Sequence, residues 1–238
     1  MLRLLAAATA CISLVATARA GSVKGTVLFE GEPPEQPVLK RGVDPKCTPN
    51  RTDEAVVVAK GKLAGVVVRV QNGTTGTHEP PAQPLAPVVI DQRDCMYAPR
   101  VVAILAGQPV LVRNSDATFH NVHGVLLSSH KDVLNKPQPP SSPDLPLDAS
   151  AAQPGDVLQL QCDVHTWMKA YVAVNDTPYF AVTGADGAFE IDNLPEGTYT
   201  LEAWHPTLGT RTLKIVIGKA KRGDVTARFS YRAIDIQP

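Results

Sequence analysis

The chain has 238 residues, with 23 Lys and Arg against 23 Asp and Glu, so its formal net charge at neutral pH is zero. This length can bury a sizeable core and form one large β domain or two small ones. The balanced charge argues against nucleic acid as a partner, because phosphate binding requires an excess of basic side chains. With 21 Pro, 17 Gly and no long helical periodicity beyond the N-terminal segment, the composition favours an all-β fold.

Residues 1–20 have the composition of a cleavable export signal. Arg3 supplies the positive start, an apolar run follows, and the small residues Ala18 and Ala20 flank Arg19 at its end. We expect cleavage after Ala20. No later stretch of the sequence provides the ~20 apolar residues that a membrane-spanning helix needs. The sequence therefore predicts an exported protein without a membrane span, located in the periplasm if the source is a Gram-negative cell.

Short alternating segments follow the signal. Residues 23–29 predict a first strand, and residues 55–63 and 66–70 predict two more strands joined at a Gly turn. A polar, Pro-bearing loop is expected over residues 72–87. Residues 136–154 are rich in Pro and Ser, and we expect them to form an extended surface loop rather than a core strand.

Residues 157–168 carry side chains that are typical metal ligands. The alternation in residues 157–162 places Cys162 on the apolar face of a strand, and residues 171–174 predict the next strand. Cys162, His165 and Met168 therefore lie on a short turn that is anchored in a sheet at both ends. A thiolate, an imidazole and a thioether form the ligand set that suits a copper ion changing oxidation state.

A second imidazole comes from an earlier stretch. The pair His120-Asn121, followed downstream by the spacing Cys162-x-x-His165-x-x-Met168, resembles the cupredoxins, and amicyanin in particular. This resemblance implies a Greek-key β-sandwich with one type 1 copper ion. It also implies three equatorial ligands and an axial one: His120, Cys162, His165 and Met168. Asn121 would tie together the two loops that bear the ligands.

Two neighbours complete the expected site. His123 is expected to be a polar neighbour of the ligands rather than a ligand itself. Trp167, which stands where amicyanin has a smaller aromatic residue, is expected to lie in an apolar docking patch beside an exposed edge of His165. The loop departs from the amicyanin pattern also in lacking its prolines, which leaves the choice of partner open.

The remaining cysteines are expected to pair. Three cysteines follow residue 20, and the resemblance assigns Cys162 to the copper. In an oxidising compartment the other two, Cys47 and Cys95, are expected to form a disulfide.

The C-terminal part has a different β pattern. Residues 186–201, with alternating apolar positions around a Leu-Pro-Glu-Gly turn, resemble the carboxypeptidase regulatory-like (transthyretin-like) β-sandwich repeat. We therefore expect a copper domain with an N-terminal extension over residues 21–175 and a smaller β region over 176–238. The latter is short for a complete sandwich, so it either borrows the N-terminal strand or packs on the copper domain.

The expected site favours electron transfer over catalysis. When the protein supplies all four ligands, the ion keeps no open position for a substrate, and the sequence shows no nucleophile with its base. We therefore expect an exported one-electron carrier that is not an enzyme. The resemblance to amicyanin implies redox partners such as a quinoprotein dehydrogenase and a c-type cytochrome, as in methylamine utilisation. Two alternatives remain: a copper-binding or copper-delivery protein without redox cycling, and a non-catalytic β-sandwich binding module.

Overall fold

The computed structural model describes residues 20–73, 85–218 and 224–237. The expected export signal, except its last residue, and most of the loop expected at 72–87 lie outside these ranges. Inside them, the helical elements are two 3-10 turns, η1 (Pro45–Cys47) and η2 (Ala233–Asp235), and the rest is strand and loop. The all-β fold class is therefore confirmed. In the same ranges, no helix has the length and apolar character needed to cross a membrane.

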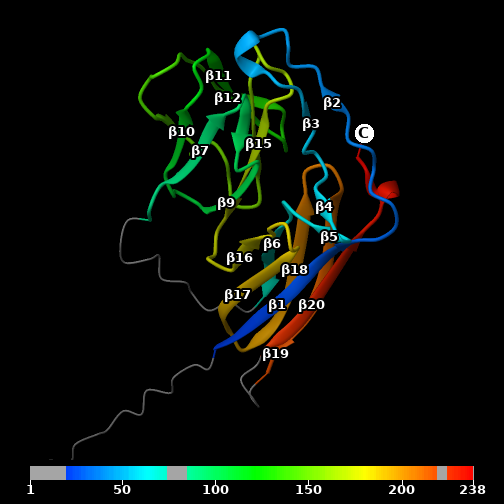
Figure 1. The fold of residues 1–238 in the computed structure, drawn as a ribbon. Helices are drawn as coiled ribbons and strands as arrows, with labels where there is room; N and C mark the ends of the chain where they lie inside the picture. The colour runs from blue at the N-terminus through cyan, green and yellow to red at the C-terminus, as the bar shows by residue number, and fades with distance from the viewer. Residues whose placement is uncertain (1–19, 74–84, 219–223, 238) are drawn as a thin grey trace, which may run out of the picture.

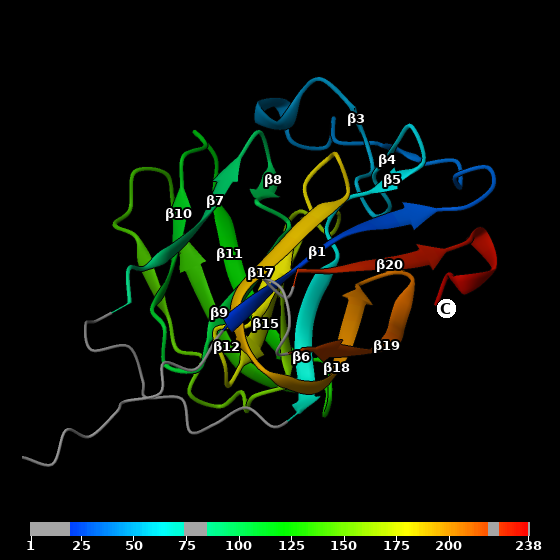
Figure 2. The same ribbon diagram turned by 90° about the horizontal axis from the view of Figure 1, so that it is seen from below.

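One sheet is organised around β1 (Ala20–Phe29). This strand pairs antiparallel with β17 (Ala188–Pro195) and parallel with β20 (Val225–Tyr231), and Figures 1 and 2 show the three strands side by side. The alternation expected for residues 23–29 places Val23, among others, in the core. A short hairpin pairs with the end of β1 and extends the sheet: β4 (Val58–Ala59) and β5 (Lys62–Leu63).

A second sheet closes the same core. Its strands, in spatial order, are β16 (Phe180–Val182), β6 (Val67–Gly73), β18 (Gly197–His205) and β19 (Gly209–Ile217). The buried core between the two sheets collects residues from 23–70 and from 179–231. Strands that precede residue 175 thus complete the sheets of the C-terminal region. We call this sandwich the outer unit.

Residues 88–175 form a second sandwich, the central unit, with its own core. One sheet has the order β13 (Leu145–Leu147), β10 (Val110–Asn114), β7 (Val88–Arg93) and β8 (Met96–Ala98). The other has the order β12 (Lys131–Gln138), β11 (His120–Leu126), β14 (Val157–Gln161), β15 (Lys169–Asn175) and β9 (Val101–Leu105). The strands expected at 157–162 and 171–174 are therefore present, and they are adjacent.

The expectation of a surface loop over residues 136–154 is wrong in part. The segment contains the end of β12 and all of β13, and Leu147 is buried against the core of the central unit. Both strands lie at the ends of their sheets. An edge strand tolerates Pro because one side of its backbone needs no partner, which explains how Pro137 and Pro146 fit into paired strands that a Pro-rich composition seemed to exclude.

A long excursion links the two units. Residues 38–52, which we call the capping segment, contain β2 (Val38–Leu39), η1 and β3 (Arg51–Thr52). In Figure 1 this blue segment leaves the outer unit after β1, rises to the top of the central unit, and returns to β4. Because its only strand pairing in the described part of the chain is β2 with β3, the segment takes its position from side-chain contacts.

The two units also meet directly. A small apolar cluster, with Val67, Val101 and Tyr171 among its members, lies between β6 of the outer unit and β9 and β15 of the central unit. Arg69 on β6 pairs with Glu202 on β18 at 2.6 Å, and the same Arg69 nitrogen donates to the Gly155 carbonyl of the central unit at 3.1 Å. The joint thus combines apolar burial with a largely buried ion pair.

Candidate metal centre

The two strands that carry the proposed ligands are neighbours in one sheet. β11 begins with His120, and Cys162 directly follows β14; the two strands pair antiparallel, with His123 opposite Gln161. This register brings His120 and Cys162 to the same end of the sheet. The loop between β14 and β15 then folds over that end, closed by a hydrogen bond from the Met168 N–H to the His165 carbonyl at 2.8 Å.

Three ligand atoms converge there. The Nδ1 atoms of His120 and His165 lie 2.9 Å apart, and the Cys162 Sγ lies 4.0 Å from the first and 3.8 Å from the second. The exposed fractions of these residues are 0%, 1% and 1% for His120, Cys162 and His165. Met168 is fully buried on the same loop, and its role as the axial ligand stays a prediction.

The Nε2 atom of each imidazole, on the side of the ring away from the Cys162 sulfur, contacts a carboxylate. The His120 Nε2 lies 2.9 Å from the Asp116 Oδ2, and the His165 Nε2 lies 3.0 Å from the Asp44 Oδ2. The hydrogen bond from Thr118 lowers the pKa of the Asp44 carboxyl. Burial raises the pKa of Asp116, but hydrogen bonds from His120 and from backbone N–H groups outweigh it and lower the pKa. Since an ionised carboxylate only accepts hydrogen bonds, the Nε2 atom of each ring carries a hydrogen.

The inner face of the site is therefore rich in electron pairs. With hydrogens on both Nε2 atoms, the two Nδ1 atoms face each other and the Cys162 sulfur, and each presents a lone pair there unless a proton or a metal ion occupies it. Burial raises the pKa of the Cys162 thiol, but the hydrogen bond from His120 and nearby backbone N–H groups outweigh it and lower the pKa. Burial lowers the pKa of His120, while Asp116 and the Cys162 sulfur raise it to about 9. The arrangement thus demands a cation, which is either a proton on His120 or a metal ion.

Asn121 connects the two ligand-bearing stretches. Its Oδ1 accepts from the Asp163 N–H at 2.6 Å, and its Nδ2 donates to the Asp163 Oδ2 at 2.9 Å. His123 points to the same carboxylate: its Nδ1 lies 2.9 Å from the Asp163 Oδ1, and its Nε2 lies 3.0 Å from the Asp132 Oδ1. Carboxylate oxygens thus lie within hydrogen-bond distance of both ring nitrogens of His123, and its role as a polar neighbour rather than a ligand stays a prediction.

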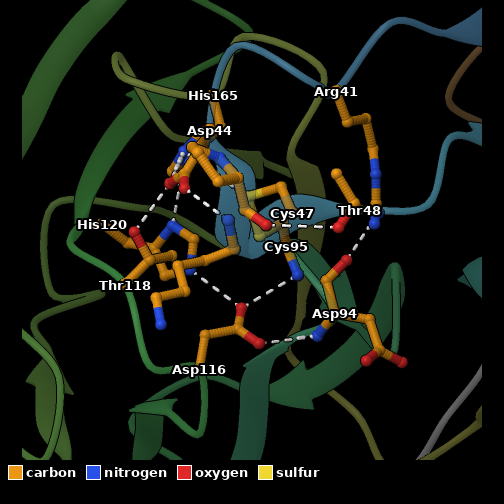
Figure 3. Close-up of a disulfide and its surroundings, with 12 residues drawn as sticks. Arg41, Asp44, Cys47, Thr48, Asp94, Cys95, Asp116, Thr118, His120 and His165 are labelled. Carbon is orange, nitrogen blue, oxygen red and sulfur yellow. Dashed lines mark hydrogen bonds and ion pairs between the residues drawn. A yellow bond between two sulfur atoms is a disulfide. The ribbon is translucent and has the colours of Figure 1, made fainter.

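The expected disulfide between Cys47 and Cys95 is confirmed, and it lies beside the site (Figure 3). The Cys47 Sγ lies 3.6 Å from the His165 Nε2. Trp167 donates from its Nε1 to the Cys95 carbonyl at 2.9 Å, and its ring centroid lies 5.2 Å from that of His165. The capping segment, the disulfide and Trp167 therefore surround the outer edge of His165.

The expectation of an exposed His165 edge is wrong, because the capping segment covers it with the Asp44 carboxylate and the Cys47 sulfur. The sequence analysis also did not identify Asp44 and Asp116 as residues of the site. Asp44 stands before a Pro at the start of a turn, a pattern that indicates only a cap. The expected Cys47–Cys95 disulfide implied that the residues around Asp44 lie near Cys95. Nothing in the sequence indicated that Cys95 lies next to His165.

Parts of two solved structures are similar to this chain. A purple cupredoxin from Nitrosopumilus maritimus matches at 21% identity, over 38% of this chain and 99% of its own, with a TM-score of 0.31. A Cu-containing nitrite reductase from Thermus scotoductus SA-01 matches at 19% identity, over 40% of this chain and 26% of its own, with a TM-score of 0.32. No protein-family model and no curated protein matches the sequence. At these TM-scores the likenesses add no weight, and the proposal below rests on the side chains of the site.

Proposed function

We propose that the protein binds one copper ion and passes single electrons to and from other proteins. His120, Cys162 and His165 would hold the ion, and Met168 would supply a fourth ligand. The observation that carries this proposal is the convergence of two Nδ1 atoms and one sulfur, all buried, with both Nε2 atoms occupied elsewhere. Two imidazoles and a thiolate with a distant thioether are the donor set of electron-transfer copper sites.

The protein's own groups would position the ligands and keep water from the ion. Copper, when bound, supplies the one-electron redox chemistry. The sheet end and the hydrogen-bonded loop fix the ligand positions, so that little atomic movement accompanies a change in the ion's charge. Burial of the imidazoles keeps water from the ion and favours transfer of electrons without exchange of ligands.

The carrier reading is favoured over copper delivery. A delivery protein must release its ion to a partner's ligands, and this requires ligands that a partner can reach. Here the three converging residues are at most 1% exposed. We propose for the same reason that the protein is a carrier rather than an enzyme, because a substrate would need a path to the ion.

The partners and compartment belong to the same proposal. An export signal over residues 1–20 and the Cys47–Cys95 disulfide support a periplasmic or otherwise oxidising location. The partners we propose are redox proteins, for example a quinoprotein dehydrogenase as electron donor and a c-type cytochrome as acceptor, as in methylamine utilisation. Mixing the purified protein with such partners and following electron transfer by stopped flow tests this part.

The visible and paramagnetic-resonance spectra of the protein loaded with Cu(II) test the site. We expect an intense thiolate-to-copper charge-transfer band that a mild reductant bleaches reversibly. Cys162→Ser should abolish the band, because the serine hydroxyl stays protonated and cannot replace the thiolate. His123→Gln is the matched control, since His123 lies nearby but faces carboxylates, and it should keep the band.

Two results would contradict the carrier. If the band persists in Cys162→Ser, the ligand assignment is wrong. If the protein binds Cu(I) tightly but never shows the band with Cu(II), it holds copper without cycling it, as a delivery protein would.

A further inference from the structure

We propose, resting on the proposed copper site, that the capping segment is a built-in cover for the metal centre and that Asp44 is a positioning residue for His165. In this proposal the Cys47–Cys95 disulfide fixes the cover in place. Its Asp44 carboxylate sets the tautomer and direction of the His165 ring, and the covered ion exchanges slowly with its surroundings. Asp44 does not contact the ion; it acts through the imidazole.

The position of Asp44 is determined from three sides (Figure 3). It is the N-cap of η1, and its Oδ1 accepts from the Lys46 N–H at 2.8 Å. Its Oδ2 accepts from the Thr118 hydroxyl at 2.7 Å and faces the His165 Nε2 at 3.0 Å. A carboxylate with this many donors has one orientation available, so the hydrogen bond to His165 is directional. Such partners typically lock the tautomer of a ligating imidazole and raise its basicity.

The cover is attached to the central unit at two further points. Cys47, in the same turn as Asp44, is bonded to Cys95, which lies 48 residues further along the chain. The fully buried Arg41 also connects the capping segment to the central unit, because its guanidinium donates to the carbonyl of Asp94, the residue before Cys95. Without these attachments, the contacts of Asp44 with Thr118 and His165 would have to hold the capping segment over the site, because the β2–β3 pairing is internal to the segment.

The disulfide also joins the two carboxylates. The Cys95 N–H donates to the Asp116 Oδ2 at 2.9 Å, and this oxygen also lies 2.9 Å from the His120 Nε2. A continuous path of contacts therefore runs from His120 through Asp116, Cys95, Cys47 and the η1 turn to Asp44 and His165. The path places both Nδ1 atoms toward the sulfur before any ion arrives, which lowers the cost of ordering the site.

The cover has an electrostatic consequence. Asp44 and Asp116 put two negative charges one imidazole away from the ion, in a region with little water to screen them. These charges stabilise Cu(II) more than Cu(I), because the interaction grows with the charge of the ion. Removal of the Asp44 charge should therefore raise the reduction potential.

Three variants test the proposal: Asp44→Ala, Asp44→Asn and the double variant Cys47→Ser/Cys95→Ser. Asp53→Asn is the matched control, because Asp53 lies near the capping segment but makes no hydrogen bond to either imidazole among the described residues. Circular dichroism first establishes that each variant is folded. The readouts are the tautomer of His165 in the copper-free protein by ¹⁵N NMR, the reduction potential, and the rate of copper transfer to a soluble Cu(I) chelator.

We expect the wild type and Asp53→Asn to show His165 with hydrogen on Nε2 and slow copper transfer. Asp44→Ala should lose the single tautomer and transfer copper faster, by about tenfold or more, the usual range for loss of such a partner. The double cysteine variant should also transfer copper faster. Asp44→Asn keeps an oxygen that can accept from Nε2 but loses the charge, so it should keep the tautomer and raise the potential.

Other results overturn the proposal. Hydrogen on the Nδ1 of His165 in the copper-free wild type would contradict the role of Asp44, and so would transfer rates and potentials in Asp44→Ala that equal those of Asp53→Asn. Because the NMR measurement needs no copper, it decides the role of Asp44 even if the wild type shows no charge-transfer band. A missing band would count against the proposed function alone.

Discussion

At the scale of single residues, His205 shows how burial produces a dependence of stability on pH. The residue is 3% exposed, and its Nδ1 accepts from the backbone N–H groups of Thr207 and Leu208. These bonds require the neutral ring, since a protonated Nδ1 cannot accept. Burial, with a smaller contribution from the Arg100 charge, lowers the pKa of His205 from 6.5 to about 4.

The sign of the effect follows from proton binding. Below its ordinary pKa, His205 takes up a proton in the unfolded chain but not in the folded one, so stability is full above pH 6.5 and falls as the pH drops toward 4. The loss approaches roughly 3 kcal/mol at the acidic end of this window. Urea unfolding at several pH values should show that His205→Asn, whose side-chain oxygen can accept in place of Nδ1, loses less stability on acidification. The exposed His130→Asn serves as control and should behave as the wild type; equal slopes for all three proteins would refute the assignment.

The convergence of the proposed ligands was predictable because their spacing has a chemical meaning. A Cys, a His and a Met at intervals of three on a turn, with a His at a distant strand end, match one metal's preferences. Asp44 and Asp116 were not predictable in the same way. A carboxylate that supports a ligand contacts only the far side of an imidazole, and this leaves no fixed spacing in the sequence.

At the scale of elements, the strands with clear alternation were found, whereas the edge strands β12 and β13 were missed. Residues 157–161 and 171–174 lie inside β14 and β15. These strands have a partner on each side and mostly buried residues, so their sequences are rich in apolar side chains. β12 and β13 each contain a Pro, which an edge strand tolerates because it needs a partner on one side only. Alternation reports burial of a face rather than strand pairing, and thus it is weakest at sheet edges.

Gly25 in the middle of β1 offers a test of this element. A Cβ at this position would overlap the Phe189 ring and the Ala227 carbonyl, which belong to the two strands on either side. Gly25→Ala should therefore push the strands apart and cost about 1–3 kcal/mol, the usual penalty for overpacking. Denaturant unfolding measures the change. Gly42→Ala, where a Cβ would meet nothing within 4 Å, is the control and should stay near wild type; a Gly25→Ala protein as stable as this control would mean that the sheet accommodates the methyl group.

At the scale of the whole molecule, Arg69 makes a polar contact of the joint between the units through Gly155, and Glu202 of its own unit pairs with it. The side chains are 12% and 8% exposed, so breaking the pair leaves a largely buried charge. Arg69→Met alone should destabilise the protein by about 3–5 kcal/mol, whereas Arg69→Met/Glu202→Leu should recover much of the loss because no charge remains unpaired. A double-mutant cycle by denaturant unfolding measures the coupling. Additive single effects would show that the pair does not act as a unit.

The sequence predicted an all-β molecule with two kinds of β region, but not which strands combine. The likeness of residues 186–201 to a known repeat left open whether that region borrows the N-terminal strand. Partner choice depends on apolar faces that match in three dimensions, and Val23 and Phe229, for example, meet in one core although they are distant along the chain. Local alternation carries no information about such distant pairings.

The parallel pairing of β1 with β20 has a consequence for how the chain acquires its structure. The central unit draws its strands from residues 88–175 and can assemble once that stretch is available. The outer unit must join its first strand to β17 on one side and to residues 225–231 on the other, and closure of such long loops is slow. We therefore expect refolding in two kinetic phases, with tertiary order in the middle of the chain preceding that of its two flanks.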